Sequence, residues 1–317
     1  MRQQQSAATH GIHTLDTGYV RPSFGAAYLV VEQGRAAFVD CGTNHSVPLL
    51  LQALADAGLG TDAVDWVVLT HAHLDHAGGA GLLMQQLPNA QLVAHPRAAP
   101  HMVDPQRLVA GATAVYGEEE FARHYGQLLP VPEERVVAAG DGHAIELGGR
   151  VLRCLDTPGH ARHHMCIWDE RSRGWFAGDT FGLSYRQLDS DAGAFILPTS
   201  SPVQFEPEAM QASIRRMLEA GPEVMYLTHY GPVREVRRLA ADLHEQIDAM
   251  VSLAQACDGG ADRHRALVAA LSEYYLERAQ AHRVPMDEAG VLDLLGMDIE
   301  LNAQGLEIWL DRSRRRG

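Results

Sequence analysis

Short apolar runs alternate with segments of helical periodicity over the first third of the chain. The runs Ala26 to Val31, Trp66 to Leu69 and Gln91 to Ala94 are rich in Val and Leu, which is typical of buried strands. Between them, Val47 to Ala57 and Ala77 to Leu87 carry apolar residues at helical spacing, and each is followed by a Gly or Pro that ends the pattern. Strands that alternate with helices predict an α/β fold.

A similar order of elements recurs in the middle of the chain. Apolar runs at Val151 to Leu155, Met165 to Trp168, Trp175 to Ala177 and Val224 to Leu227 predict four further strands, and Pro207 to Leu218 predicts a helix before the last of them. Element order therefore predicts two similar halves, although no sequence repeat marks a duplication.

Two long segments interrupt this order. Residues 101–132 include a helical pattern from Glu118 to Leu129, and residues 181–207 are rich in Ser, Pro and Asp. Long connections form substrate lids in some enzymes and structural insertions in others, and both interpretations stay open here.

The chain is helical in pattern almost throughout after Pro232. This change predicts a catalytic domain over residues 1–235 and a helical C-terminal extension over residues 236–317. Whether the extension forms a homodimer contact stays open. The expected helices are Val233 to Ala256, Arg263 to Ala281 and Asp287 to Leu295. The basic cluster at the very end is expected to be a solvated, frayed tail. It consists of Arg312, Arg314, Arg315 and Arg316.

Composition restricts the classes of function. With 317 residues, 46% of them hydrophobic, the chain can bury a full core. It has no run of the roughly 18 apolar residues that a membrane span needs, and its start lacks the apolar centre of a signal peptide, so a cytoplasmic protein is expected. A net charge of -14 disfavours nucleic acid as a partner. All 26 basic residues are Arg, which excludes mechanisms that need a lysine amine.

Candidate chemistry is concentrated where predicted strands end. His71, His73, Asp75 and His76 follow the apolar run that begins at Trp66. Residues two apart in extended backbone project to the same side, so His71 and His73 can bind one ion, while Asp75 and His76 turn toward a second. Burying such groups without partners costs about 1–3 kcal/mol for each one. The cluster therefore predicts a metal site.

Three more candidate ligands follow later strands. His160 lies in a Thr-Pro-Gly-His turn, Asp179 ends the run that starts at Trp175, and His229 follows the last predicted strand. Because side chains at the carboxyl ends of strands converge on one crevice in α/β folds, these residues are expected to meet the first cluster.

Together these residues predict a binuclear metallo-hydrolase. The expected ligands are His71, His73 and His160 for one ion, Asp75, His76 and His229 for the other, and Asp179 as a bridge between them. Two ions roughly 3.5 to 4 Å apart lower the pKa of a bridging water to near neutral, and the resulting hydroxide can attack a polarised substrate. Asp75 and Asp179 are therefore expected to be catalytic.

Four segments in this order resemble the metallo-β-lactamase superfamily, and within it the glyoxalase II-like branch. They are THAHLDHAGG, TPGHARHH, GDT and LTHYGP, and the resemblance runs from about Tyr28 to Pro232. It implies a four-layer αββα sandwich of two mixed sheets, with helices outside and the metals at one edge. It also implies that the substrate is a small ester, thioester or lactone.

The resemblance suggests roles for residues beside the ligands. Asp40 resembles the family's strand-end aspartate that supports the metal-binding loop, and His164 resembles a histidine expected to make a structural hydrogen bond. Lactonases of this superfamily use a tyrosine near the bridging aspartate. Tyr185 is the candidate for that catalytic role and Tyr230 is an alternative, although neither has the lactonase spacing and a purely structural role is the competing interpretation.

Other functions stay open. The main alternative is a mononuclear iron persulfide dioxygenase of the same superfamily, which the second set of ligands disfavours. A flavodiiron oxidoreductase is disfavoured because that branch has glutamate in place of His73, and a binding protein that has lost turnover would keep the site without its activity. Zinc is the expected metal, with iron and manganese as alternatives, because mixed His and carboxylate ligands accept all three.

Overall fold

The computed structural model describes residues 9–200, 203–259 and 262–315, and its contacts divide the chain into two compact units. The first unit holds the chain up to Asp156, His163–Gly178 and Glu223–Pro232. The second holds Thr157–Arg162, Asp179–Pro222 and the chain from Val233 onward. The C-terminal helices thus share a unit with connections from the middle of the chain, and the domain boundary predicted at residue 235 stays a prediction.

Two six-stranded mixed sheets make up most of the first unit. The strands are β1 (Ile12–Asp16), β2 (Ala26–Glu32), β3 (Arg35–Val39), β4 (Val64–Val68), β5 (Gln91–Ala94), β6 (Val136–Ala138), β7 (Ala144–Leu147), β8 (Arg150–Asp156), β9 (Met165–Asp169), β10 (Gly174–Gly178), β11 (Val224–Leu227) and β12 (Gly231–Val233). The first sheet runs in chain order, antiparallel from β1 to β3 and parallel from β3 to β6. The second has the order β12-β11-β10-β9-β8-β7, antiparallel from β7 to β10 and parallel between β10 and β11.

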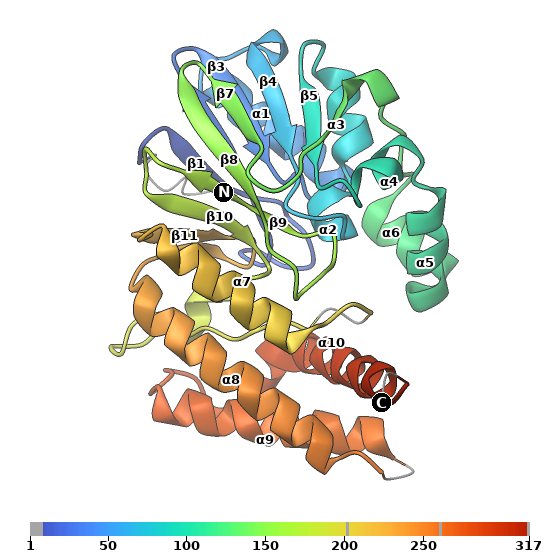
Figure 1. Cartoon of the computed structure of the whole chain (residues 1–317), viewed down its shortest axis with the longest axis vertical. Coiled ribbons are helices and arrows are strands. Elements are labelled where there is room, and N and C mark those ends of the chain that lie inside the picture. Colours follow the sequence, from blue (N-terminus) through green and yellow to red (C-terminus); the bar gives the residue numbers. More distant parts are fainter. Residues whose placement is uncertain (1–8, 201–202, 260–261, 316–317) are drawn as a thin grey trace. The chain divides into compact units, whose positions relative to one another are not determined.

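Both faces of the first sheet are buried, which explains why its strands appear in the sequence as nearly continuous apolar runs. On one face, Leu29 belongs to a core that includes side chains from α1 (Val47–Asp56) and α3 (Ala80–Gln86), and Figure 1 shows both helices beside the strands. On the other face, Tyr28 contacts Phe176 of β10 edge to face, with ring centroids 5.3 Å apart. The two sheets therefore pack face to face.

Four long helices dominate the second unit. They are α7 (Pro207–Glu219), α8 (Val236–Ala256), α9 (Arg263–Ala281) and α10 (Glu288–Arg314). Helix α8 packs against α7 and α9, and α10 packs against α8 and α9 (Figure 1). The predicted fold class is confirmed, with two mixed six-stranded sheets, flanking helices and a helical C-terminal region. Among the described residues, no helix is both long and apolar enough to cross a membrane.

The segment of residues 101–132 differs from its prediction. The helix expected from Glu118 to Leu129 is α6 (Glu118–Tyr125), which stops at Gly126, where φ is +66°. Two helices, α4 (Ala99–Val103) and α5 (Gln106–Tyr116), precede it and were not predicted. None of the described α5 side chains is fully buried, so no buried apolar face marked this helix in the sequence.

Glycines account for two further differences. The helix expected from Ala77 to Leu87 is divided into α2 (Leu74–Ala77) and α3 by Gly78 and Gly79. A Cβ atom on Gly79 would lie 2.6 Å from the Thr43 carbonyl oxygen, so the close approach of the two backbones requires glycine. Gly231–Val233 forms strand β12 instead of starting a helix, and α8 begins only at Val236.

The C-terminal end is helical, and the prediction of a frayed tail is wrong for two of its arginines. Helix α10 continues past the predicted stop at Leu295 to Arg314. Within the second unit, Arg312 forms an ion pair with Glu206, and Arg314 lies 2.6 Å from Asp258. These acidic partners are distant in sequence, so the pattern of the tail alone did not reveal them. Arg316 lies outside the described residues.

Candidate metal centre

The end of β4 and the start of α2 position four of the predicted ligands. His71 and His73 follow β4, and His73 is the N-cap of α2, with an extended backbone of φ -67° and ψ 147°. As predicted from their spacing, the two side chains face each other, with His71 Nε2 and His73 Nδ1 2.8 Å apart. Asp75 and His76 lie in the single helical turn of α2.

Asp75, His76 and His229 form one group of ligand atoms, all within 4.8 Å of one another. An Asp75 carboxylate oxygen lies 3.6 Å from His76 Nε2 and 3.3 Å from His229 Nε2. His229 follows β11, and its Nδ1 lies 2.7 Å from the carbonyl oxygen of Phe24. Because a carbonyl only accepts hydrogen bonds, His229 Nδ1 carries the proton and Nε2 is left as the ligand atom.

His160 and Asp179 lie together in the second unit. His160 follows the turn after β8, Asp179 follows β10, and His160 Nε2 is 3.4 Å from an Asp179 carboxylate oxygen. The other ring nitrogen, His160 Nδ1, donates to the Thr199 carbonyl oxygen at 3.2 Å. This bond again leaves Nε2 as the ligand atom.

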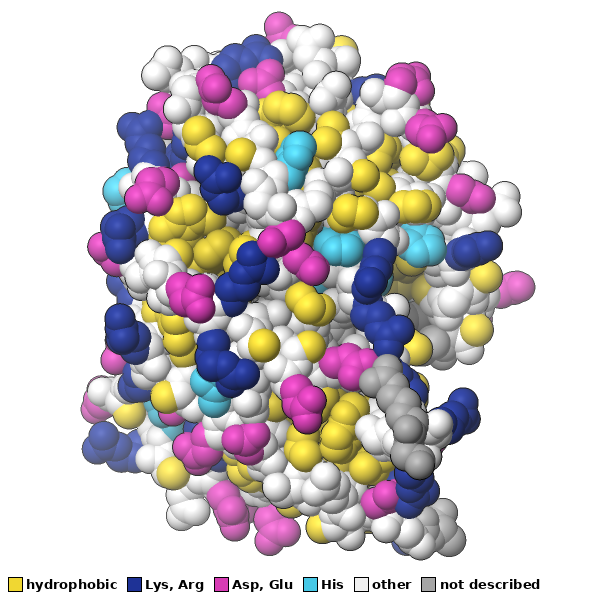
Figure 2. Space-filling model, viewed as in Figure 1, with side chains coloured by type: hydrophobic (Ala, Val, Ile, Leu, Met, Phe, Trp, Pro, Cys, Tyr) yellow, Lys and Arg dark blue, Asp and Glu magenta, His cyan; other side chains and the backbone are white. Residues whose placement is uncertain are grey.

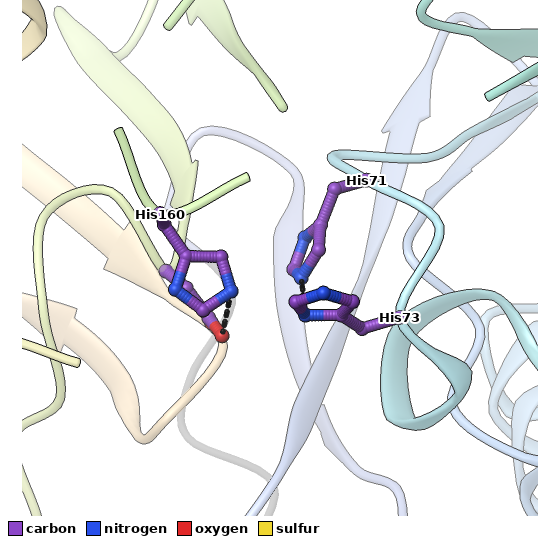
Figure 3. Close-up of side chains that lie close together, drawn as sticks. His71, His73 and His160 are labelled. Atoms are coloured by element: carbon purple, nitrogen blue, oxygen red, sulfur yellow. Dashed lines mark hydrogen bonds and ion pairs between the residues drawn. The ribbon is translucent and has the colours of Figure 1, made fainter. Parts of the chain in front are cut away.

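The other candidate ligands are His71 and His73 in the first unit, and His160 and Asp179 in the second. Figure 3 shows His71 and His73 against each other and His160 bonded to a carboxylate oxygen. The bridging role expected for Asp179 stays a prediction.

The donor atoms of these candidate ligands fit divalent metal ions. Imidazole nitrogens and carboxylate oxygens are the ligands that zinc, iron and manganese share. His71 and His76 are fully buried, and His160, His229 and Asp179 are at most 5% exposed. Burying so many polar groups is unfavourable unless an ion or hydrogen bonds compensate for the lost water.

Asp40 accepts hydrogen bonds from four groups beside the Asp75 group. Its carboxylate accepts from the backbone amide of Thr70 at 2.8 Å, from His76 Nδ1 at 2.9 Å and from the hydroxyls of Thr70 and Thr228. The bond to Nδ1 leaves His76 Nε2 facing Asp75. The supporting role predicted for Asp40 stays a prediction, and these contacts are those that such a role requires.

Sequence reasoning missed the two threonines that bind Asp40. Thr70 and Thr228 each stand directly before a ligand, in the two Leu-Thr-His segments of the chain. The repetition of this tripeptide at two strand ends was a signal that could have pointed to both hydroxyls. Phe24 was missed as well, and its ring lies edge-on to His229 with centroids 5.0 Å apart. No sequence signal distinguished it from an ordinary core residue.

His164 and His163 lie beside the ligands of the first unit. His164 is fully buried and stacks on His71, with ring centroids 4.8 Å apart. Gly178 approaches it so closely that a Cβ atom there would lie 2.5 Å from His164 Nε2. His163, which was given no role, accepts a hydrogen bond from the Ala72 amide at 3.3 Å. Both histidines thus form part of the packing around His71 and its loop.

Of the two candidate tyrosines, one contacts a C-terminal helix and the other packs against an apolar core. Tyr185 is fully buried, and its hydroxyl donates to Asp298 of α10 at 3.2 Å. Tyr230 is partly buried against the core between the two sheets. These contacts support structural roles, and the catalytic role predicted for Tyr185 stays a prediction.

Comparison with known proteins identifies the family. Residues 20–229 match the model of the metallo-beta-lactamase superfamily, and the chain belongs to this superfamily. The chain is similar to the metallo-beta-lactamase fold-containing protein ST1585 of Sulfurisphaera tokodaii, with 27% identity over 228 residues that cover 70% of this chain and 79% of that protein. The crystal structure of ST1585 superposes with a TM-score of 0.64 and 23% identity, covering 95% of this chain and 99% of that one.

Two further relatives are named as a hydrolase and a thioesterase. A hydroxyacylglutathione hydrolase of Stenotrophomonas maltophilia is 29% identical over 161 residues, covering 50% of this chain and 47% of that protein. An atrochrysone carboxyl ACP thioesterase of Pseudocercospora fijiensis is 26% identical over 175 residues, covering 54% of this chain and 42% of that protein. The chain therefore spans about half the length of these two relatives.

Proposed function

We propose that this protein is a two-metal hydrolase that cleaves a small ester, thioester or lactone. The observation that carries the proposal is the set of imidazoles and carboxylates that each unit contributes: His71, His73, Asp75, His76 and His229 from the first, and His160 and Asp179 from the second. Divalent ions bound there would polarise a substrate oxygen and lower the pKa of a coordinated water to near neutral. Zinc is the first metal to test, with iron and manganese as alternatives.

The chain's own residues prepare the site by orienting the histidines. Phe24 and Thr199 offer carbonyl oxygens to His229 and His160, and Asp40 offers a carboxylate to His76. Each of these acceptors keeps the proton of the facing histidine on its Nδ1, so that the Nε2 of that histidine keeps its lone pair for a ligand bond. A site oriented in this way before it binds an ion loses little freedom on binding.

Thioesters are the first substrates to test, because both partial relatives described above are named for enzymes of that kind. Any anionic part of the substrate would have to be recognised by arginine, histidine or backbone amides, since the chain has no lysine. Figure 2 shows arginine side chains interspersed with Asp and Glu on the face drawn, which fits a small-molecule substrate better than nucleic acid.

The test combines metal analysis with hydrolysis assays on one gently purified preparation. We expect about two equivalents of metal and hydrolysis of at least one thioester, lactone or aryl ester, with activity lost on chelation and restored by zinc. His76→Ala should lose both metal and activity. His264→Ala is the matched control, because His264 is bound by Glu300 and Glu307 of α10 and is half-exposed.

Two outcomes would overturn the proposal. A chelated, metal-free protein that kept its full esterase activity would show that the metal groups do not catalyse hydrolysis. One equivalent of iron, no hydrolysis and oxygen uptake with a persulfide would instead place the protein among the dioxygenases of the superfamily.

A further inference from the structure

A buried asparagine in the C-terminal helix contacts both neighbours of the residue that orients His160. Asn302 lies within α10 and is 1% exposed. Its side-chain amide donates to the Pro198 carbonyl oxygen at 3.2 Å, and its Oδ1 accepts from the Ser200 backbone amide at 2.7 Å. Between these two positions lies Thr199, whose carbonyl oxygen accepts from His160 Nδ1.

The side chain of Ser200 also binds α10. The Ser200 hydroxyl donates to the Asn302 carbonyl oxygen at 2.9 Å, a carbonyl that belongs to the helix backbone. Pro198 and Ser200 are thus both fixed to one residue of α10, and the peptide groups on either side of Thr199 have little freedom to rotate. The direction of the Thr199 carbonyl follows from that restriction.

Asn302 is itself held in one orientation. Its amide also donates to the hydroxyl of Tyr275 in α9, at 3.1 Å. Tyr275 is fully buried, and its hydroxyl donates in turn to the Met250 sulfur of α8 at 3.7 Å. The Ser200 amide can only donate and the Pro198 carbonyl can only accept, so these two contacts fix which end of the Asn302 amide faces Ser200.

We propose that Asn302 is a positioning residue for the metal ligand His160, acting through the Thr199 carbonyl. The inference rests on the proposed metal site, and it gives the C-terminal helical region, which lies outside the matched residues 20–229, a part in building that site. In this arrangement α10 determines where the Nδ1 proton of His160 is bound, and therefore where its Nε2 lone pair points.

Gln246 of α8 provides a matched control. It is fully buried, and its side-chain amide donates to the carbonyl oxygen of Ile196 at 2.8 Å. Gln246 therefore binds the same connection as Asn302 through the same kind of bond, but not at a neighbour of Thr199. A purely structural role predicts equal effects of truncating either residue, whereas the positioning role predicts an effect on the metal only at Asn302.

The experiment compares Asn302→Ala and Gln246→Ala with the wild-type chain. Zinc affinity is measured by titration against a competing chromophoric chelator. The visible absorption spectrum is then recorded after cobalt substitution. For Asn302→Ala we expect one of the two zinc equivalents to bind about tenfold more weakly, as for other partners of a ligand's second ring nitrogen. We also expect a changed cobalt spectrum. Gln246→Ala should lose a similar amount of thermal stability while both zinc equivalents and the spectrum stay unchanged.

Equal zinc affinities and spectra in Asn302→Ala and the wild type would overturn the inference, as would the same weakening in Gln246→Ala. If Asn302→Ala does not fold, Tyr275→Phe removes the hydroxyl that orients the Asn302 amide while keeping the ring, and it should weaken the same zinc equivalent by a smaller factor. Wild-type protein that binds neither zinc, iron nor manganese would refute the proposed function itself. A wild type that binds two equivalents, with an unaltered Asn302→Ala, would refute only the inference.

Discussion

The carboxylate of Asp40 accepts a hydrogen bond from His76 Nδ1 at 2.9 Å, and both side chains are almost completely buried. Asp40 has a left-handed backbone, with φ of +57°, at the point where the chain leaves β3. This conformation is uncommon outside glycine, and asparagine and aspartate tolerate it best. The backbone turn and the support of a ligand are therefore joined in one residue.

Replacing Asp40 with asparagine should separate these two roles. Asn keeps the left-handed backbone and an acceptor for the Thr70 amide, but it removes the negative charge that faces His76. We expect the metal held by the Asp75 group to bind about 10 to 100 times more weakly. Zinc titration measures this change. Asp40→Ala should lose at least as much affinity and unfold at a lower temperature; unchanged zinc affinity in both variants would contradict the supporting role.

Gly178→Ala should destabilise the fold. The added Cβ would lie 2.5 Å from His164 Nε2 and 2.9 Å from Thr70 Cβ, and the φ of +49° is itself unfavourable for alanine. The expected loss in the free energy of unfolding is about 1–3 kcal/mol. Urea unfolding measures it, with Gly296→Ala in α10 as the control.

Gly296 lies inside a helix, and a Cβ atom added there would meet no neighbouring atom within 4 Å. Alanine at this position should therefore be stabilising by about 0.5–1 kcal/mol. Equal stabilities of the Gly178 and Gly296 variants would contradict the close packing of His164 against β10.

The buried pair of Arg150 and Asp169 should make stability depend on acid pH. Burial alone raises the pKa of Asp169, but hydrogen bonds from Arg150 and Ser172 outweigh burial, and the pKa lies below its ordinary value. A lowered pKa stabilises the fold above the unfolded-state pKa of about 3.9, and this contribution is lost as the pH falls through the folded-state pKa. Unfolding measured from pH 7 down to pH 2 should show the loss.

Arg150→Met should remove this acid dependence and destabilise the protein at neutral pH. Arg150 Nε donates to Asp169 at 2.8 Å, and both residues are buried. Without its ion-pair partner, the buried Asp169 carboxylate keeps hydrogen bonds from the backbone amides of Arg171 and Ser172 but loses the opposite charge, and the expected loss is about 3–5 kcal/mol. A variant with wild-type stability at pH 7 would show that the pair contributes nothing to the fold.

Tyr185→Phe tests the tyrosine that the family resemblance suggested as catalytic. Because its hydroxyl is bound to Asp298, we expect a loss of about 1.5–3 kcal/mol in unfolding free energy, typical of a hydrogen bond to a charged group, with unchanged zinc content and kcat. Steady-state kinetics and thermal unfolding together measure both effects. A large fall in kcat without any loss of stability would instead support the catalytic role.

Much of the fold could be predicted from the sequence because its strands are buried on both faces. Continuous apolar runs such as Ala26 to Val31 and Trp66 to Leu69 coincide with β2 and β4 to within one or two residues. Strands such as β7, which is buried on alternate residues, and the three-residue β6 and β12 were missed. Alternating or very short segments carry too weak a pattern to be distinguished from loops.

The sequence by itself determined the candidate ligands, because their chemistry is local: each histidine or aspartate stands just after an apolar run in a turn that a Gly or Pro marks. Only the tertiary structure decided what orients them. Asp40 reaches His76 from another strand, and Asn302 reaches the segment beside Thr199 from about a hundred residues away. Hydrogen bonds between distant segments depend on how helices and strands pack, and that packing leaves no periodic trace in the chain.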